Sequence, residues 1–451
     1  MIYLPTKDLF TCTVVNLVWE KEARNRLRSR TVSNIELKSP MEILRPYYNE
    51  QICLSWGFHG YSKELLRRLE DFAVANRNKV RHLTIPFFID GGNYSNQFFK
   101  ILKIFGDKLT SLRLQLFLQY VFQDNTLLPE VENLSSFLTN FTNKDLVFPS
   151  ITNFEFDSPN LPSASVILAK LAPIFPNVTM LQCQEDTICG NIFNLQNYVS
   201  QFPKLKSFSF TNRASTLPPQ IQQDWSQINL TRLEFYTSRD NSLGAILLQT
   251  VAPTLEKVAI TLTGTRSRLW VPILPRLRVL KITRYDGKSC KVGHEVRLQF
   301  ETEDDATGVK IDYEKQFPVL EQLIVRRSNL RGSEPDLQFC FDSTAQFLYS
   351  SFTPFTDKVA VCRTLRKLDI PLPPGKHFRL RHENDGVHQS CPNICNCWNW
   401  EESTKFLNRL GESFPNVKYH YLEERRLGFG QEMGDHASRL LRHLATKIDR
   451  Q

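Results

Sequence analysis

Residues 202–210 read Phe202-Pro203-Lys204-Leu205-Lys206-Ser207-Phe208-Ser209-Phe210. The pattern is an apolar residue, proline, any residue, an apolar residue, two variable residues, and then two apolar residues separated by one. A unit this short cannot bury its own apolar face, so its recurrence predicts copies that stack on one another. Close copies occupy residues 148–156, 175–183, 252–260, 274–282 and 317–325, and looser copies occupy 80–85, 109–114, 230–235, 365–370 and 414–421.

The apolar–x–apolar end of each copy predicts a short β-strand, and an amphipathic helix precedes many of these strands. The proline between helix and strand is expected to end the helix and to favour extended geometry in the residue before it. The predicted helices span residues 63–75, 95–105, 164–171, 192–201, 243–251 and 404–412. The strands that follow them span residues 80–85, 109–114, 178–183, 205–210, 255–260 and 417–421.

The distance between successive strands points to a class of fold. The first apolar residues of the central strands stand at positions 151, 178, 205, 230, 255 and 277, which are 22 to 27 residues apart. This spacing, with the apolar–x–x–apolar–x–apolar pattern, resembles an irregular leucine-rich-repeat protein over residues 62–425. The resemblance implies an α/β fold, a leucine-rich-repeat solenoid in which a curved parallel sheet carries outer helices. The asparagine or cysteine expected beyond each strand is mostly missing, which leaves the repeat subtype open.

A doubly wound α/β enzyme is the competing interpretation. No glycine-rich phosphate loop follows any predicted strand, and units of about 25 residues are short for a strand–helix–strand crossover with full-length helices. The chain also contains no H-E-x-x-H or G-x-S-x-G motif. We therefore predict a binding protein rather than an enzyme, with no catalytic residues and no cofactor.

The N-terminal segment, defined as residues 1–30, does not share the repeating pattern. Asp8 is a predicted helix N-cap, and Leu9, Cys12, Val15 and Trp19 follow it at helical spacing on one face. This spacing resembles the second half of an F-box, whereas the first F-box helix would lie before Met1. An ordinary amphipathic helix that caps the repeat array is the alternative.

The F-box resemblance implies that the N-terminal segment contacts the Skp adaptor of a ubiquitin ligase. Leu9, Val15 and Trp19 would form the apolar face of the docking helix. The adaptor-binding residues that the resemblance implies are Leu4, Pro5, Asp8, Leu9, Cys12, Val15 and Trp19.

Beyond the N-terminal segment, we expect a transition (residues 31–61), the array (62–425) and a C-terminal helical cap (426–451). Strand spacing widens at three insertions, which span residues 284–316, 326–360 and 371–403. In the first insertion, residues 296–300 alternate between apolar and polar and predict an extra strand.

The last insertion is rich in possible metal ligands. Cys391, Cys395 and Cys397 lie near His382 and His388. These residue types suit zinc, but three cysteines within seven residues match no common zinc spacing. We predict loop and core cysteines here, and no metal site.

Composition restricts the class of protein further. The chain is 41% hydrophobic and carries a net charge of +9, from 56 basic and 47 acidic residues. No apolar run approaches the roughly 18 residues of a membrane helix, and the ten scattered cysteines without a secretion signal indicate reduced thiols. We expect a protein of the cytoplasm or nucleus. No aromatic-interleaved RNA-binding motif accompanies the charge, which disfavours nucleic acid as a partner.

Alternation along each strand places every second residue on the face of the sheet that lies away from the helices. On the early strands these residues are mostly acidic or neutral, with Arg113 among them, whereas the later strands carry a lysine or arginine each. The pattern predicts a ligand whose negative charge faces the strands between residues 230 and 370, although unselected surface residues would also explain it. The predicted partner-binding residues are Arg232, Glu234, Tyr236, Lys257, Lys281, Arg326 and Lys367.

The two resemblances together imply the substrate-recognition subunit of a Skp–cullin–F-box ubiquitin ligase. Such a subunit docks on the Skp adaptor and the cullin complex and holds a target protein on its repeat surface, while other subunits transfer ubiquitin. A leucine-rich-repeat scaffold with no ligase link is the alternative. An enzyme with its site in residues 371–403 is a third possibility.

Overall fold

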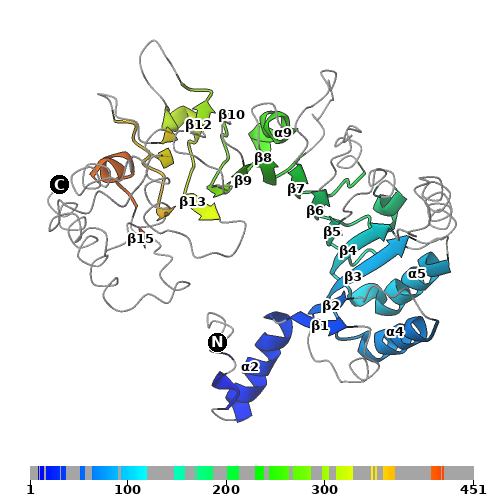
Figure 1. Cartoon of the computed structure of the whole chain (residues 1–451). Helices are drawn as coiled ribbons and strands as arrows, with labels where there is room; N and C mark the ends of the chain where they lie inside the picture. Colours follow the sequence, from blue (N-terminus) through cyan, green and yellow to red (C-terminus); the bar gives the residue numbers. More distant parts are fainter. Residues whose placement is uncertain are drawn as a thin grey trace, which may run out of the picture. The chain divides into compact units, whose positions relative to one another are not determined.

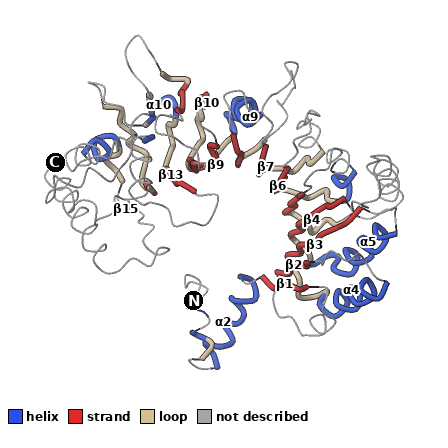
Figure 2. Tube along the Cα trace, viewed as in Figure 1, coloured by secondary structure: helices blue, strands red, loops and turns tan. Residues whose placement is uncertain are grey.

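Figures 1 and 2 show the computed structural model, in which the described residues form helices, parallel strands and the turns between some of them. The described residues fall in two compact units, the N-terminal unit (Met1–Ala214 with Gln222–Ile228) and the C-terminal unit (Ser215–Ile221 with Asn229–Gln451). The described residues are 9, 11–14, 17–30, 32–36, 51–55, 63–89, 93–118, 147–157, 168, 170–185, 201–212, 229–237, 243–263, 268–285, 297–303, 311–328, 347–348, 351–352, 359–370, 408–417 and 419–420.

In the N-terminal unit, parallel strands lie side by side in the order in which they occur in the chain. Their register is regular: Asn153 pairs with Met180, which pairs with Ser207. Strands β1 and β2 lie in the predicted transition yet join β3, so the sheet begins before the predicted boundary at residue 62. The strands are β1 (Val32–Glu36), β2 (Gln51–Ser55), β3 (His82–Ile89), β4 (Ser111–Leu118), β5 (Asn153–Asp157), β6 (Met180–Glu185) and β7 (Ser207–Asn212).

Helices α4 (Lys63–Asn76) and α5 (Asn93–Phe105) confirm two of the predicted helices and lie side by side next to the first strands (Figure 1). Their apolar faces are buried, as Phe72 of α4 and Phe99 of α5 illustrate. The described part of the predicted helix at residues 164–171 is helical, whereas most of the one at 192–201 lies outside the described residues. The other helices of this unit are α2 (Leu17–Arg30) and the short 3-10 helices η1 (Gly106–Lys108) and η2 (Ala172–Ile174).

The C-terminal unit has a second run of parallel strands in chain order, with helix α9 (Leu243–Val251) at the predicted position. The strands are β8 (Arg232–Thr237), β9 (Lys257–Thr263), β11 (Val279–Tyr285), β13 (Gln322–Ser328), β14 (Lys367–Asp369) and β15 (Tyr419–His420). Its short helices are η3 (Ala252–Thr254) and α10 (Tyr313–Gln316). Residues 408–413 confirm part of the predicted helix at 404–412, and the predicted cap at 426–451 lies outside the described residues.

Two strands of the C-terminal unit form a separate small sheet. Strand β12 (Arg297–Phe300) confirms the extra strand predicted in the first insertion, and it pairs in parallel with β10 (Arg268–Val271). Phe300 then contacts Phe317 and Phe352, with ring centroids 5.7 Å and 5.5 Å apart. The inserted strand is therefore part of the core of the unit. The fold class is α/β with parallel sheets, an arrangement compatible with a solenoid.

Tight turns with proline in second position precede many of the strands. In residues 202–205, the Leu205 amide donates to the Phe202 carbonyl at 3.0 Å. Proline suits the second position of such a turn because its φ is fixed and it has no amide to donate. Besides following the helix, the proline of the repeated pattern therefore builds the turn. The same bond closes the turns at residues 148–151, 175–178, 274–277, 317–320 and 414–417.

The backbone contacts between neighbouring strands follow one pattern within each unit. The Thr110 carbonyl accepts bonds from the Thr152 and Asn153 amides, and the Thr152 carbonyl accepts bonds from the next two equivalent amides. In the C-terminal unit, the Glu256 carbonyl is bonded in the same way. Since each strand start is tied to the previous one, the register of the side chains on the sheet is set from strand to strand.

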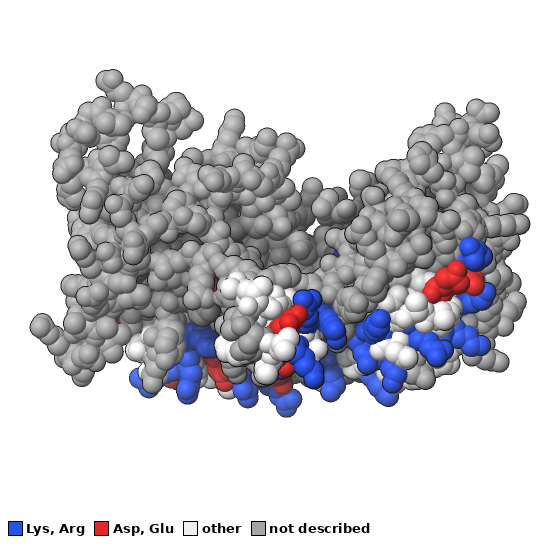
Figure 3. Space-filling model, turned by 90° about the horizontal axis from the view of Figure 1, so that it is seen from below, with Lys and Arg blue, Asp and Glu red and all other residues white. Residues whose placement is uncertain are grey.

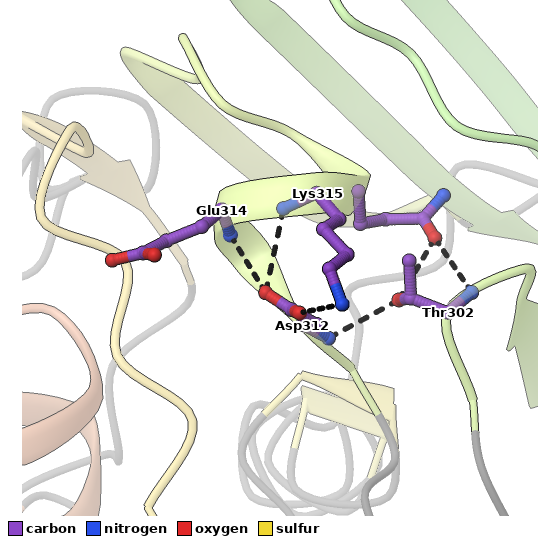
Figure 4. Close-up of polar contacts among 5 residues, drawn as sticks. Thr302, Asp312, Glu314 and Lys315 are labelled. Carbon is purple, nitrogen blue, oxygen red and sulfur yellow. Dashed lines mark hydrogen bonds and ion pairs between the residues drawn. The ribbon is translucent and has the colours of Figure 1, made fainter.

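A capped short helix joins the small sheet to the main sheet of the C-terminal unit (Figure 4). Asp312 caps α10: its Oδ1 accepts from the amides of Glu314 and Lys315 at 3.1 Å and 3.3 Å. Its Oδ2 lies 3.3 Å from Lys315 Nζ, and its own amide donates to Thr302 Oγ1 at 3.1 Å. The cap thereby ties α10 to the turn after β12.

Gln316 is a fully buried polar residue at the end of α10. Its Nε2 donates to the carbonyls of Val271 and Pro272 at 3.1 Å and 2.6 Å, and its Oε1 accepts from the amide and hydroxyl of Thr302 at 3.2 Å and 3.1 Å. Both polar atoms of this side chain are thus hydrogen-bonded, one to the end of β10 and the residue after it and the other to the turn after β12.

The isosteric change Gln316→Glu is expected to destabilise the C-terminal unit by at least about 2 kcal/mol, because it removes the donor to Val271 and Pro272 and buries a carboxylate. Chemical denaturation followed by circular dichroism measures the loss. Glu314→Gln is the control, because it makes the reverse exchange at an exposed position. It should change the free energy of unfolding by less than about 0.5 kcal/mol. Equal stabilities of the two variants would contradict this role of Gln316.

Candidate functional site

The regular register gathers the seven predicted partner-binding residues on one face of the C-terminal sheet, here called the polar face. Their neighbours in sequence, such as Leu233, Val258 and Leu280, are buried on the opposite side. Strand pairing sorts the polar face into three rows across the strands. The rows are Arg232–Lys257–Val279–Gln322–Lys367, then Glu234–Ala259–Lys281–Ile324–Asp369, and then Tyr236–Thr261–Thr283–Arg326.

The arginines of the polar face already have acidic partners. Arg326 Nη2 lies 2.8 Å from Asp369 Oδ2, and Asp369 is only 6% exposed. Arg232 Nη2 lies 3.6 Å from Glu234 Oε2. Arg326, which we predicted as a partner contact, therefore forms an ion pair with a buried carboxylate of the chain itself.

The lysines of the polar face are different. Among the residues that the structure describes, none forms an ion pair with Lys257, Lys281 or Lys367. Lys257 and Lys367 are exposed and Lys281 is half-buried. The net positive charge of the polar face therefore resides on the lysines.

Basic side chains also gather elsewhere on the described surface, with acidic ones among them (Figure 3). At the strand starts of the C-terminal unit, Glu256, Arg278, Glu321 and Arg366 follow one another in strand order. Arg278 Nη1 lies 3.3 Å from Glu321 Oε1. Because charges alternate along this edge, they largely compensate, unlike the lysines of the polar face.

The corresponding face of the N-terminal unit carries a compact charged cluster. Arg113 on β4 lies between two carboxylates of β5: its Nε is 3.1 Å from Glu155 Oε1 and its Nη2 is 3.5 Å from Asp157 Oδ2. Gln115 donates to the same Asp157 oxygen at 3.3 Å. This face is thus acidic and neutral, with its one arginine paired among the residues described in β4 and β5.

Burial raises the pKa of the Glu155 carboxyl above its ordinary value of 4.5; the nearby Arg113 charge lowers this pKa and the Asp157 charge raises it. The folded state therefore holds the Glu155 proton more tightly than the unfolded state does. As pH rises from 4.5 through the raised pKa, the wild type should lose stability relative to Glu155→Gln, which does not titrate. Unfolding of both proteins across this range measures the difference. A difference that is constant, or that grows in favour of the wild type with rising pH, would contradict the expectation.

The N-terminal segment has a small core of its own. Leu9 and Cys12 are buried together with Ala23 and Leu27 of α2. These two predicted adaptor contacts therefore hold the segment together, and the predicted contacts Leu4, Pro5, Asp8 and Val15 lie outside the described residues.

Large apolar side chains of the N-terminal segment are exposed instead. Val14 is 81% exposed, Leu17 82%, Val18 77%, and the predicted contact Trp19 is 44% exposed. We call these four residues the apolar patch. Helical periodicity did not identify Val14, Leu17 and Val18, because it selects residues at regular spacing on one face. Two of the residues that it selected, Leu9 and Cys12, instead build the small core.

The cysteine-rich insertion at residues 371–403, with Cys391, Cys395 and Cys397, lies outside the described residues. Within the described ranges, no group of His, Cys, Asp and Glu side chains is arranged to hold a metal ion. None of the described helices has the length and apolar character that a membrane crossing requires.

Comparison with known proteins does not assign the chain to a family. No protein-family model matches the sequence, and no curated protein matches it significantly.

Proposed function

We propose that this chain is an F-box-like leucine-rich-repeat protein, the substrate-recognition subunit of a Skp–cullin–F-box ubiquitin ligase. The N-terminal segment would dock on the Skp adaptor, and the polar face would hold the target protein. Other subunits would transfer ubiquitin, so the chain itself would carry no catalytic residue.

The apolar patch is the observation that carries this proposal. Val14, Leu17 and Val18 are each more than three-quarters exposed, next to the half-exposed Trp19. Clustered exposed apolar side chains on a folded segment mark a surface that another protein covers. Leu9 and Cys12 are buried in the small core of the segment, so the apolar patch lies on a folded element.

The recurring strands supply the second half of the proposal. Stacked strand units give an extended surface whose alternate residues face a partner, as in leucine-rich-repeat arrays. The seven predicted partner-binding residues lie together on such a surface, ordered by strand pairing. This arrangement supports binding of an extended protein surface more than it supports binding of a small molecule in a pocket.

Co-expression with a Skp adaptor tests the proposal. We expect the adaptor to co-purify with the chain in a stable complex. The ligase role fails if the adaptor is captured neither by this chain nor by a longer product that includes an upstream F-box helix. A chain that binds target proteins through its polar face but never the adaptor would instead be a leucine-rich-repeat scaffold, which the polar face alone would support.

A further inference from the structure

We infer that the polar face binds an extended, acidic protein segment, and that Lys257, Lys281 and Lys367 are the residues that recognise its carboxylates. This inference rests on the proposed function, because it names the chemical class of the target.

The polar face carries both paired and unpaired charges. Glu234 and Asp369 are the carboxylates on the polar face among its described residues, and each is already engaged by an arginine. The three lysines are left without an ion-pair partner in the described part of the chain. A negatively charged ligand could form ion pairs with these lysines without breaking an existing ion pair.

The three lysines have a defined spacing on the polar face. Lys257 on β9 and Lys367 on β14 lie in the same row, separated by β11 and β13, which places their backbones about 14 Å apart at the usual strand spacing. Lys281 on β11 lies one row further along, about 8 Å from Lys257. The half-buried residues Ala259 and Val279 lie between the lysines and form a small apolar surface.

An extended protein segment matches this spacing. Its residues rise about 3.4 Å each and alternate sides, so residues i and i+4 point the same way about 14 Å apart. A segment crossing the strands could place acidic residues i and i+4 at Lys257 and Lys367, with residue i+2 within reach of Lys281. The recognised pattern would be three acidic residues at alternate positions.

The acids of the polar face favour a protein segment over a nucleic acid. Glu234 and Asp369 stand at the two ends of the row that contains Lys281. A phosphate backbone, charged at every nucleotide, would place negative charge against the half-buried Glu234 at one end of this row, whereas a protein segment can carry charge only opposite the lysines. Asp369 is buried and paired with Arg326, so it does not enter this comparison. Ala259, Val279 and Gln322, which lie between the lysines, are not aromatic, whereas single-stranded nucleic acids usually need aromatic side chains on which bases stack.

Fluorescence anisotropy with a labelled peptide of alternating Ser and Glu tests this inference on the full chain. The variant Lys257→Gln/Lys281→Gln/Lys367→Gln should bind the peptide about tenfold more weakly than the wild type, and added salt should weaken wild-type binding. The control Lys103→Gln/Lys108→Gln/Lys170→Gln removes the same charge from exposed positions of the N-terminal unit and should bind like the wild type. Arg326 is left unchanged, because removing it would leave the buried Asp369 unpaired.

A peptide of alternating Ser and Gln should show no binding, and unchanged thermal unfolding should confirm that both triple variants fold. The inference is overturned if the two triple variants bind equally, if the Gln peptide binds as well as the Glu peptide, or if a single-stranded oligonucleotide binds more tightly than the Glu peptide. The assay contains no Skp adaptor, so its failure is distinguishable from failure of the ligase proposal.

Discussion

The double substitution Leu17→Asp/Val18→Asp is expected to weaken capture of the Skp adaptor by about 100-fold or more. Both side chains are almost fully exposed in the free chain, so they are available to fill an apolar site on a partner. Interfaces depend on a few apolar anchors, and a charge placed at such a position must be desolvated on binding. The substitutions leave the buried cluster of Leu9, Cys12, Ala23 and Leu27 unchanged, so the segment should remain folded.

Val74→Asp is a matched control for this experiment. Val74 is 55% exposed on α4, outside the N-terminal segment, and the substitution introduces the same chemistry. Titration of immobilised adaptor with each purified chain should give wild-type affinity for the control and strongly reduced affinity for the double variant. If the double variant binds as tightly as the control, the apolar patch is not the docking surface.

Gly244→Ala should be the most damaging small substitution among the described glycines, because a Cβ at this position would overlap Cδ2 of the Phe235 ring. Phe235 is fully buried, so its ring can move aside only by displacing other core side chains. Overpacking of this kind costs about 1–3 kcal/mol, and this contact is close enough to place the loss at the upper end. Denaturant titration of the full chain measures the change in the free energy of unfolding.

Gly411→Ala serves as the control for the glycine prediction. Apart from its own helix, no atom of the described residues lies within 4 Å of a Cβ built at Gly411, which lies in a helix, so alanine should be neutral or stabilising there. Adding Phe235→Leu to Gly244→Ala should recover part of the loss, since the smaller side chain leaves space for the methyl group. Wild-type stability of Gly244→Ala would show that α9 does not lie as close to β8 as described.

The sequence predicted strand positions well because each strand has a strong local signature. Phe208 and Phe210, for example, are both buried in β7, as the apolar–x–apolar pattern predicts. The pairing of β10 with β12 could not be predicted, because it brings together segments whose sequences have no relation to the repeated unit. Gln316 carries no local signal either, since its role depends on the carbonyls of Val271 and Pro272, more than forty residues away.

The candidate site, like the fold, could be predicted from the sequence only in part. Alternation alone was sufficient to place Lys257, Lys281 and Lys367 on one face. The ion pair of Arg326 with Asp369 needed the register of β13 against β14, which the spacing of residues along the chain does not give. In the N-terminal segment, periodicity predicted one helical face from Leu9 to Trp19, whereas residues 13 and 14 form a turn and Trp19 belongs to α2. Periodicity also could not distinguish Leu9 and Cys12, which build a core, from Leu17 and Val18, which are exposed.

Hydrogen exchange of the purified chain with and without saturating Skp adaptor tests the ligase proposal most directly, because it detects both binding and its location. We predict that the adaptor slows amide exchange within residues 9–30 and leaves the strands from β8 to β14 unaffected. Unchanged exchange in residues 9–30 at saturating adaptor, or protection confined to the C-terminal unit, would contradict it.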